Sequence, residues 1–209
     1  MNASPTSLIL DDFRRRLCAY GPMGLVKRAA IRGWRQLAYR GSLIFRWSVQ
    51  ATPVDSRADV RVVRCTSSSN LPAALNAELA RSLGPRYPQT IQDEFSNHGV
   101  LHLALIHDQL AALHWIRAGS HVPAWFVPLD RQDVVVFGCV TLPQHRGRGI
   151  MPWLVTHSVK SDGVPAQYAF ADCRVWNRPA HRVFAKAGFE CIGRAYKFAW
   201  RNPSSPHAG

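Results

Sequence analysis

Strand-like and helix-like patterns of hydrophobic positions alternate along the chain from about residue 58 onward. Residues 59–65 (DVRVVRC) alternate polar and apolar side chains, which is typical of a half-buried strand. The run VLHLALIHDQLAALHWIRAG breaks at Asp108 between two apolar segments and predicts a hairpin, while residues 133–141 predict a buried strand. The other predicted elements are helices at 71–83, 90–97, 148–160 and 179–187 and strands at 167–175 and 192–200.

The first quarter of the chain has a different pattern. Residues 22–40 place apolar side chains every three or four positions, with Lys and Arg on the other side, which predicts a basic amphipathic helix. The apolar run at 42–49 is compatible with a strand, and ATPVDSR at 51–57 is typical of a linker. We therefore divide the chain into a basic N-terminal extension (1–57), a folded domain (58–200) and a flexible tail (201–209).

The charge balance favours anionic partners. The chain has 26 Lys and Arg against 13 Asp and Glu, a formal net charge of +13. Nine of these basic residues and two Asp lie in residues 1–50, so a quarter of the chain carries about half of the excess. Nucleic acid, an anionic membrane surface or a phosphorylated small molecule are the expected partner classes. With 47% hydrophobic and 19% charged side chains, a disordered protein is excluded.

Several other classes are excluded by pattern. No apolar run approaches the ~18 residues of a membrane span, and the N-terminus lacks the order of a secretory signal, so we expect a cytoplasmic protein. The five cysteines are odd in number, widely spaced and without a C-x-x-C pair, which argues against a disulfide framework and a zinc site. The nine histidines show no metal-ligand spacing, so we expect no metal.

The candidate chemistry lies between the strand at 133–141 and the helix after it, in PQHRGRGI (143–150). Two glycines at a strand-to-helix turn let the backbone approach a ligand, and the free N–H groups of the helix start suit a phosphate or pyrophosphate. Arg146 and Arg148 add positive charge. A glycine pair at a helix start is equally compatible with simple turn chemistry, and the segment is neither a Walker loop nor a complete dinucleotide fingerprint.

A second segment, NRPAHRVFAKAGF (177–189), follows the strand at 167–175. Asn177 is suited to cap the start of a helix, with Pro179 in its first turn, and Gly188 is suited to end it. This structural interpretation is as well supported by the residues as a ligand-binding one.

With these two segments in this order, the chain resembles the GNAT acetyltransferase superfamily. TLP (141–143) and RGRGIM (146–151) match its Val-x-Pro strand end and its Arg/Gln-x-x-Gly-x-Gly/Ala phosphate motif, except at Thr141 and Met151. The later motif Asn-x-x-Ala/Ser-x-x-Φ-Tyr-x-x-x-Gly-Phe, in which Φ is apolar, is matched except at its Tyr, where the chain has Phe184. The matching residues are Asn177, Ala180, Val183, Gly188 and Phe189.

The resemblance covers about residues 58–200 and implies an α/β (α+β) fold with a mixed, mostly antiparallel central sheet flanked by helices. It also implies acetyl-CoA, or another acyl-CoA, as co-substrate in a wedge between the strands ending at Thr141 and near Val175. Backbone groups of residues 139–141 would hold the pantetheine arm and the amides of residues 146–151 the pyrophosphate. The implied cofactor contacts are Cys139, Val140, Thr141, Arg146, Gly147, Arg148, Gly149, Ile150, Met151, Asn177 and Phe184.

The implied reaction is acyl transfer to a primary amine by direct attack. Asp172, five positions before Asn177, is the candidate base, and the alternative is a solvated or ion-paired strand residue near Arg174. The backbone N–H near Val140 is the candidate oxyanion donor. Relatives often have Glu where this chain has Phe137, and Phe184 cannot protonate a thiolate as Tyr would. Asp133, His102 and His114 are weaker candidates for the base.

No motif in the sequence identifies the acceptor substrate. An amino sugar or another small amine would fit a pocket formed by residues 71–97, the segment 119–130 with Trp125 and Phe126, and the final strands. The helix at 22–40 would either pack on the domain or rest on anionic lipid at the inner face of the membrane, near a membrane-associated acceptor; nucleic acid is less favoured. The alternative function is a catalytically impaired relative that binds acyl-CoA or docks on membranes.

Overall fold

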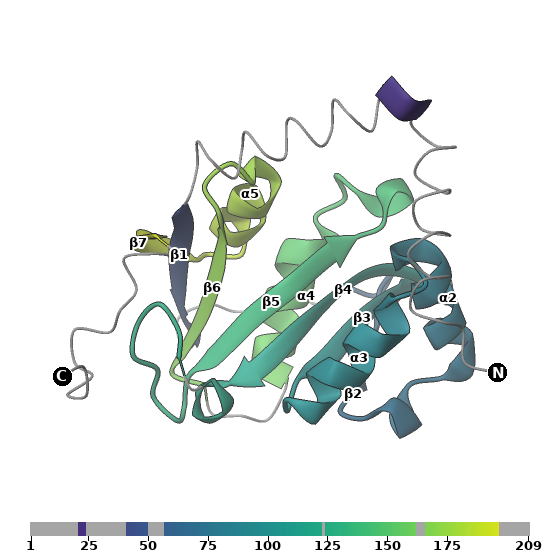
Figure 1. Ribbon diagram of the computed structural model, residues 1–209, viewed down its shortest axis with the longest axis horizontal. Coiled ribbons are helices and arrows are strands. Elements are labelled where there is room, and N and C mark those ends of the chain that lie inside the picture. The colour runs from purple at the N-terminus through teal and green to yellow at the C-terminus, as the bar shows by residue number, and fades with distance from the viewer. Residues whose placement is uncertain (1–20, 24–40, 50–56, 123, 162–165, 197–209) are drawn as a thin grey trace.

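The structure is a computed structural model that describes residues 21–23, 41–49, 57–122, 124–161 and 166–196. Four longer helices and seven strands make up the described part (Figure 1). The strands are β1 (Gly41–Ser48), β2 (Arg61–Cys65), β3 (Val100–Ile106), β4 (Gln109–Ala118), β5 (Val134–Thr141), β6 (Tyr168–Arg174) and β7 (Glu190–Tyr196). The helices are α2 (Ala73–Leu83), α3 (Tyr87–Ser96), α4 (Ile150–Ser161) and α5 (Arg178–Lys186).

The seven strands form one sheet in the order β2-β3-β4-β5-β6-β1-β7. Every neighbouring pair is antiparallel except β5 and β6, which run parallel. The predicted hairpin is β3–β4, and β5 leads into α4 as the buried apolar run indicated. The expectation of a mixed, mostly antiparallel sheet flanked by helices is confirmed.

Each face of the sheet has its own hydrophobic core, because successive side chains of a strand point to opposite faces. On one face, α4 and α5 cover sheet residues such as Val136 and Ala171, and together with helix residues such as Phe184 of α5 these form what we call the first core. On the other, α2 and α3 cover Leu103, Leu113 and further Leu side chains of β3 and β4, the second core. Within the described residues, every helix is too short to cross a bilayer.

Strand β1 confirms the strand expected at 42–49. It is part of the central sheet, however, and not of an extension separate from the domain. It lies inside the sheet, antiparallel to both β6 and β7, so it pairs with two strands that lie 120 or more positions later in the sequence. Its Phe45 and Trp47 rings lie 5.2 and 5.7 Å from those of Phe184 and Phe189. Pairing between segments this distant leaves no local pattern in the sequence.

Other parts of the sequence-based division concern residues outside the described ones. The amphipathic helix expected at 22–40, the linker at 51–57 and the tail at 201–209 lie there, apart from residues 22, 23 and 57. The predicted helices at 148–160 and 179–187 begin two residues later and one residue earlier, at Ile150 and Arg178. The last strand begins at Glu190, two residues before its predicted start.

Candidate active site

The centre of the candidate site is the point where the two parallel strands separate. Register pairs between β5 and β6 run only from Val134–Ala169 to Val136–Ala171. Beyond them β5 continues to Thr141 and β6 to Arg174, and the two strands diverge (Figure 1). From Phe137 onward β5 therefore pairs with β4 alone, so polar backbone groups on its other edge have no strand partner. The structure thus contains the separation of strands that the sequence led us to expect.

A β-bulge lies in β5 directly after this point. Between the pairs Leu113–Val140 and Trp115–Phe137, β5 has one residue more than β4. Gly138 carries the distortion with a φ of +62°, and a Cβ atom there would lie 2.9 Å from Cδ1 of Trp115. Phe137 and Val140 consequently both face the second core. Such a bulge re-aims the backbone, and its conformation and crowding both demand glycine.

The turn between β5 and α4 also depends on glycine, for another reason. Gly147 and Gly149 have φ of +78° and +70°, and a Cβ atom on either would meet nothing within 4 Å. Only their backbone conformation therefore calls for glycine. The side chains of Ile150 and Met151 lie in the first core, so the departure from the small residue expected at Met151 is accommodated away from the turn. The first amides of α4 have no intrahelical partners, which makes them available to an anion.

The two arginines of the turn are held by neighbouring groups. Arg146 Nε donates a hydrogen bond to the Thr141 carbonyl, at 3.1 Å, and Arg148 Nη1 lies 3.5 Å from Nδ1 of His145. Each guanidinium has five N–H donors, so both retain donors for a phosphate.

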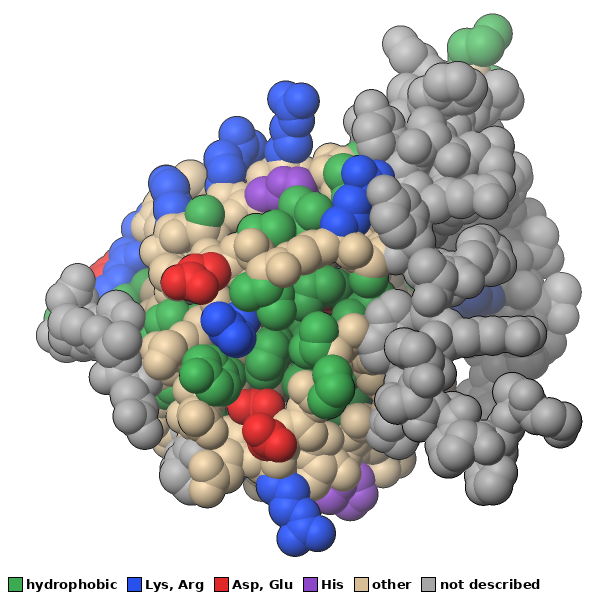
Figure 2. Space-filling view, turned by 90° about the vertical axis from the view of Figure 1, so that its left-hand side faces the viewer, with side chains coloured by type: hydrophobic (Ala, Val, Ile, Leu, Met, Phe, Trp, Pro, Cys, Tyr) green, Lys and Arg blue, Asp and Glu red, His purple; other side chains and the backbone are tan. Residues whose placement is uncertain are grey.

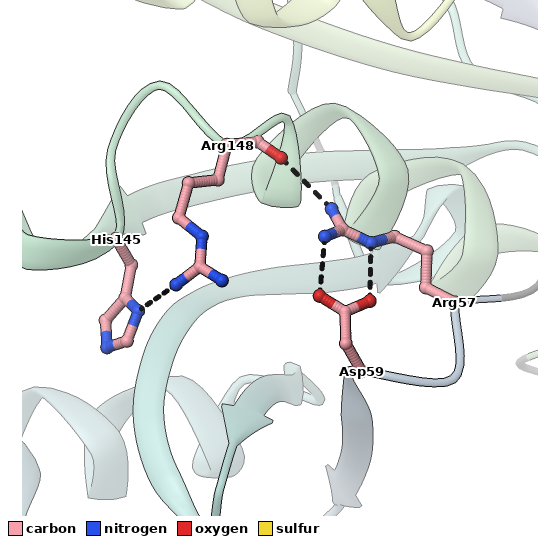
Figure 3. Close-up of polar contacts among 4 residues, drawn as sticks. All are labelled: Arg57, Asp59, His145 and Arg148. Carbon is pink, nitrogen blue, oxygen red and sulfur yellow. Dashed lines mark hydrogen bonds and ion pairs between the residues drawn. The ribbon is translucent and has the colours of Figure 1, made fainter.

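A third arginine reaches the turn from outside the motif. Arg57 Nη1 donates to the carbonyl of Arg148 at 3.1 Å (Figure 3). Arg57 belongs to the segment that the sequence pattern predicts to be a linker, and no pattern there indicates this contact.

Asp172 lies on β6, where Ala171 and Cys173 beside it face the first core. By strand alternation its carboxyl lies on the opposite face, where it is partly buried. Burial raises the pKa of this carboxyl, while a hydrogen bond from Ser42 and the charge of Arg174 act in the opposite direction. Both interpretations of Asp172 thus find support, since a raised pKa suits a base and Arg174 is a charged neighbour. Ser42 was missed because it comes from β1.

The other predicted backbone contacts of the cofactor, Cys139 and Val140, lie near the C-terminal end of β5. Val140 lies opposite Leu113, and Cys139 packs against the first core. Burial raises the pKa of the Cys139 thiol to about 12, so it is a neutral thiol near pH 7 and no nucleophile.

The second motif forms a helix with both ends capped. Asn177 Oδ1 accepts a hydrogen bond from the amide of Ala180, at 3.4 Å. At the other end, Gly188 has a φ of +84° and donates to Ala185, while Phe189 donates to the Phe184 carbonyl, as in a Schellman motif. The rings of Phe184 and Phe189 lie 5.5 Å apart inside the first core. Asn177 and Phe184 thus have structural roles, and their contact with a cofactor stays a prediction.

The weaker base candidates lie elsewhere. Asp133 precedes β5 at the end opposite Thr141, and its Oδ2 accepts a hydrogen bond from the Asp130 amide at 2.8 Å. His102 and His114 are partners in the β3–β4 register and stack 5.2 Å apart in the interior. In the described part of the chain, no group of three or more His, Cys, Asp and Glu side chains is arranged to hold a metal ion.

Aromatic side chains of the segment 119–130 lie near the same face as Asp172. The Trp125 ring is 5.5 Å from that of Phe170, which precedes Asp172 by two positions on β6. Figure 2 views the molecule from the side of β7, where apolar side chains gather in the middle of the face and Lys and Arg side chains lie along its upper edge. Trp125 and Phe126 are half-buried, and through Trp125 the segment expected to border an acceptor contacts Phe170 of β6.

Comparison with known proteins agrees with this geometry. The model of the acetyltransferase (GNAT) family matches residues 72–189, more than half of the chain. No curated protein sequence matches significantly.

Among solved structures, an acetyltransferase of the GNAT family from Colwellia psychrerythraea has a TM-score of 0.53 at 16% identity, covering 76% of this chain and 56% of its own. A functionally unknown conserved protein from Staphylococcus epidermidis has 0.53 at 13%, covering 78% and 63%. The glucosamine N-acetyltransferase region of a fungal multi-domain beta-N-acetylglucosaminidase has 0.53 at 15%, covering 80% and 22%. The chain therefore spans less than two thirds of each neighbour, and these likenesses concern the fold alone.

Proposed function

The chain belongs to the GNAT acetyltransferase family, and from this premise we propose that it transfers an acyl group from acyl-CoA, in the simplest case acetyl-CoA, to the primary amine of a small molecule. The single observation that carries the proposal is the separation of β5 and β6 beyond Val136, with the bulge at Gly138 and the glycine turn beside it. Together they leave backbone polar groups of β5 and of the α4 start free for an extended, phosphorylated ligand.

The cofactor roles follow from these free groups. The amides of residues 146–151 would bind the pyrophosphate, because helix N-termini favour anions and the two arginines add charge. Backbone groups of residues 139–141 would hold the pantetheine arm, with Thr141 offering less because Arg146 already bonds its carbonyl. Residues 134–209 hold ten Lys and Arg against three Asp and Glu, whereas 51–133 hold seven against eight, so positive charge gathers in the part that forms this site.

The chemical roles concern the amine and the thioester that acyl-CoA supplies. Asp172 would take the proton from the attacking amine, directly or through a water, and its raised pKa brings it nearer to neutrality than an ordinary aspartate. The amide of Val140 would donate to the oxygen on which charge develops. With Phe184 in the first core, water would protonate the departing thiolate.

The acceptor is proposed to be an amino sugar or a membrane-associated amine. The half-buried Trp125 beside Phe170 supports a sugar or another ring, since aromatic faces stack on such groups. In the membrane case, the basic segment 22–40 would rest on anionic lipid at the inner face, and the protein would be cytoplasmic.

The second candidate function is an acyl-CoA-binding protein without turnover. Two observations favour it: Phe137 stands where relatives often have Glu, and Phe184 is buried without a proton to donate.

A calorimetric titration with acetyl-CoA tests binding first. We expect saturable binding, weakened by Gly149→Ala, because alanine is strained at a φ of +70°. Gly193→Ala is the control, since that glycine has no positive φ and open space around it. Absence of binding by the wild-type protein would exclude both candidate functions.

Screening a panel of amines with acetyl-CoA while detecting free thiol then separates the two candidates. Thiol release that depends on the amine supports the transferase, and binding without release supports the alternative. The base is tested by the pH profile of kcat/KM. Ionised Asp172 is required, so the rate should fall as pH drops through a pKa above the ordinary aspartate value, and Asp172→Asn should remove that limb.

Vesicle flotation with and without phosphatidylglycerol tests the membrane role. The matched variant replaces Lys27, Arg28, Arg32 and Arg35 by Gln in the full chain. Truncation near residue 51 is unsuitable because it would remove β1 from the sheet. Equal flotation of the two proteins would remove the membrane proposal.

A further inference from the structure

Arg57 joins two parts of the molecule that are 91 residues apart in sequence. Its Nη1 donates to the Arg148 carbonyl at 3.1 Å, while Nε and Nη2 donate to the two carboxylate oxygens of Asp59, at 3.1 and 2.8 Å (Figure 3). The guanidinium also lies 6.0 Å from the ring of Trp153, in the first turn of α4. All three guanidinium nitrogens therefore donate a hydrogen bond, two of them to the carboxylate and one to the turn.

The carbonyl that Arg57 holds belongs to an unusually free peptide. The Arg148–Gly149 unit is flanked on one side by Gly149, which has a φ of +70° and no atom within 4 Å of the place where a Cβ would lie. Glycine accepts positive and negative φ about equally, so the Gly149 end of this peptide plane offers little steric resistance to its rotation. A hydrogen bond from outside the turn is then what selects one orientation.

That orientation decides where an amide points. In a trans peptide the carbonyl and the N–H of one plane point in opposite directions, and no described peptide is cis. With the Arg148 carbonyl directed at Arg57, the N–H of Gly149 is directed away from it. Rotation of the plane would reverse both and present a carbonyl oxygen where the amide had been, which repels an anion.

We propose that Arg57, held in place by Asp59, is a positioning residue that fixes the Arg148–Gly149 peptide so that the Gly149 amide is presented to the cofactor phosphates. This inference rests on the proposed function. Arg57 acts through the turn and does not itself touch the ligand.

The Asp59 carboxylate makes the brace persistent. Its hydrogen bond with Arg57 lowers the pKa of Asp59, with burial acting against it, so the carboxylate stays ionised near neutral pH. A bidentate carboxylate also fixes the plane of a guanidinium, which a point charge such as Lys cannot reproduce.

The test compares Arg57→Ala with a matched ion pair elsewhere. Arg61 pairs with Asp108 at 2.6 Å on the surface, and its strand β2 is separated from β5 by β3 and β4, so Arg61→Ala removes a similar Arg–Asp contact without touching the proposed brace. Calorimetry measures the Kd of each full-length variant for CoA and for acetyl-pantetheine, which carries no phosphates. Backbone NMR of the cofactor-free proteins reports the Gly149 amide shift.

We expect Arg57→Ala to weaken CoA binding by about tenfold, in the range seen when a residue that orients a ligand-binding group is removed. Binding of acetyl-pantetheine should be unchanged, KM for acyl-CoA should rise with little change in kcat, and the Gly149 amide shift should move. Arg57→Lys should recover only part of the loss, and Arg61→Ala should match the wild type in every measurement.

Two results would overturn the inference: CoA affinity of Arg57→Ala equal to that of the wild type, or an equal loss for CoA and acetyl-pantetheine. Failure of the proposed function looks different, because then the wild-type protein itself would not bind CoA. In that case an unmoved Gly149 shift in Arg57→Ala would separately refute the brace.

Discussion

Replacing Gly138 by alanine probes the bulge on which the candidate site depends. Two costs arise at this position, one from the backbone and one from space. The φ of +62° lies in the left-handed region, and the new Cβ would lie 2.9 Å from Cδ1 of Trp115. Trp115 is itself fully buried between Phe95 and Phe137, so it has little freedom to move.

The magnitude follows from these two costs. A non-glycine residue in the left-handed region costs roughly 1–2 kcal/mol. Forcing a methyl group into a filled interior costs roughly 1–3 kcal/mol more. Gly138→Ala should therefore reduce the free energy of unfolding by about 2–5 kcal/mol. Gly147→Ala carries the first cost alone, because nothing lies within 4 Å of its Cβ, and should lose only about 1–2 kcal/mol.

Urea unfolding followed by tryptophan fluorescence and circular dichroism measures both variants against the wild type. A second variant, Gly138→Ala with Trp115→Phe, tests the contact directly, since the smaller ring should make the alanine less costly there than in the wild-type background. Equal losses for Gly138→Ala and Gly147→Ala would refute the reasoning, because the contact with Trp115 would then contribute nothing.

Three further predictions concern titrating and buried groups. Asp172→Asn should lower turnover by about 100-fold or more, as loss of a general base does. Because burial disfavours the ionised carboxyl, the variant should lose no stability to unfolding at pH 7. A loss of stability without a loss of rate would show that the residue is structural. Phe184→Tyr should lower the free energy of unfolding by about 1–3 kcal/mol, because the new hydroxyl enters an apolar cluster. Its turnover should equal that of the wild type. Faster turnover would instead show that this side chain lies at the thioester. The pKa of His157 is lowered by burial and by the charge of His102, so the unfolded state binds protons more readily and stability should fall as pH drops below about 6.5. His157→Gln should flatten that dependence in urea titrations at pH 5 and pH 7, and an unchanged slope would contradict it.

Local patterns were a good guide wherever the chain interacts with its own neighbours in sequence. The capping of α5 by Asn177 and its ending at Gly188 follow from residue types a few positions apart. The same holds for the glycine turn before α4 and for the β3–β4 hairpin. The motif carrying the family resemblance lies in these local features, which explains why the family was recognisable without the structure.

Nonlocal features were not predictable in the same way. Gly138 gave no sign of the bulge, because its necessity comes from Trp115 on the neighbouring strand. The burial of Phe184 against Phe45 depends on β1, a strand whose pattern indicated an extension outside the domain. Arg57 was assigned to a linker, although its guanidinium bonds the turn 91 residues later.

The sequence by itself determined the family and most of the helices and strands, because capping, turn chemistry and hydrophobic period are encoded in residues that are near one another. Only the tertiary structure decided that β1 completes the sheet between β6 and β7, which brings Ser42 beside Asp172. It also decided which groups hold the turn. The physical reason is that strand pairing and side-chain contacts depend on which residues are close in space. A pattern along the sequence does not report that proximity.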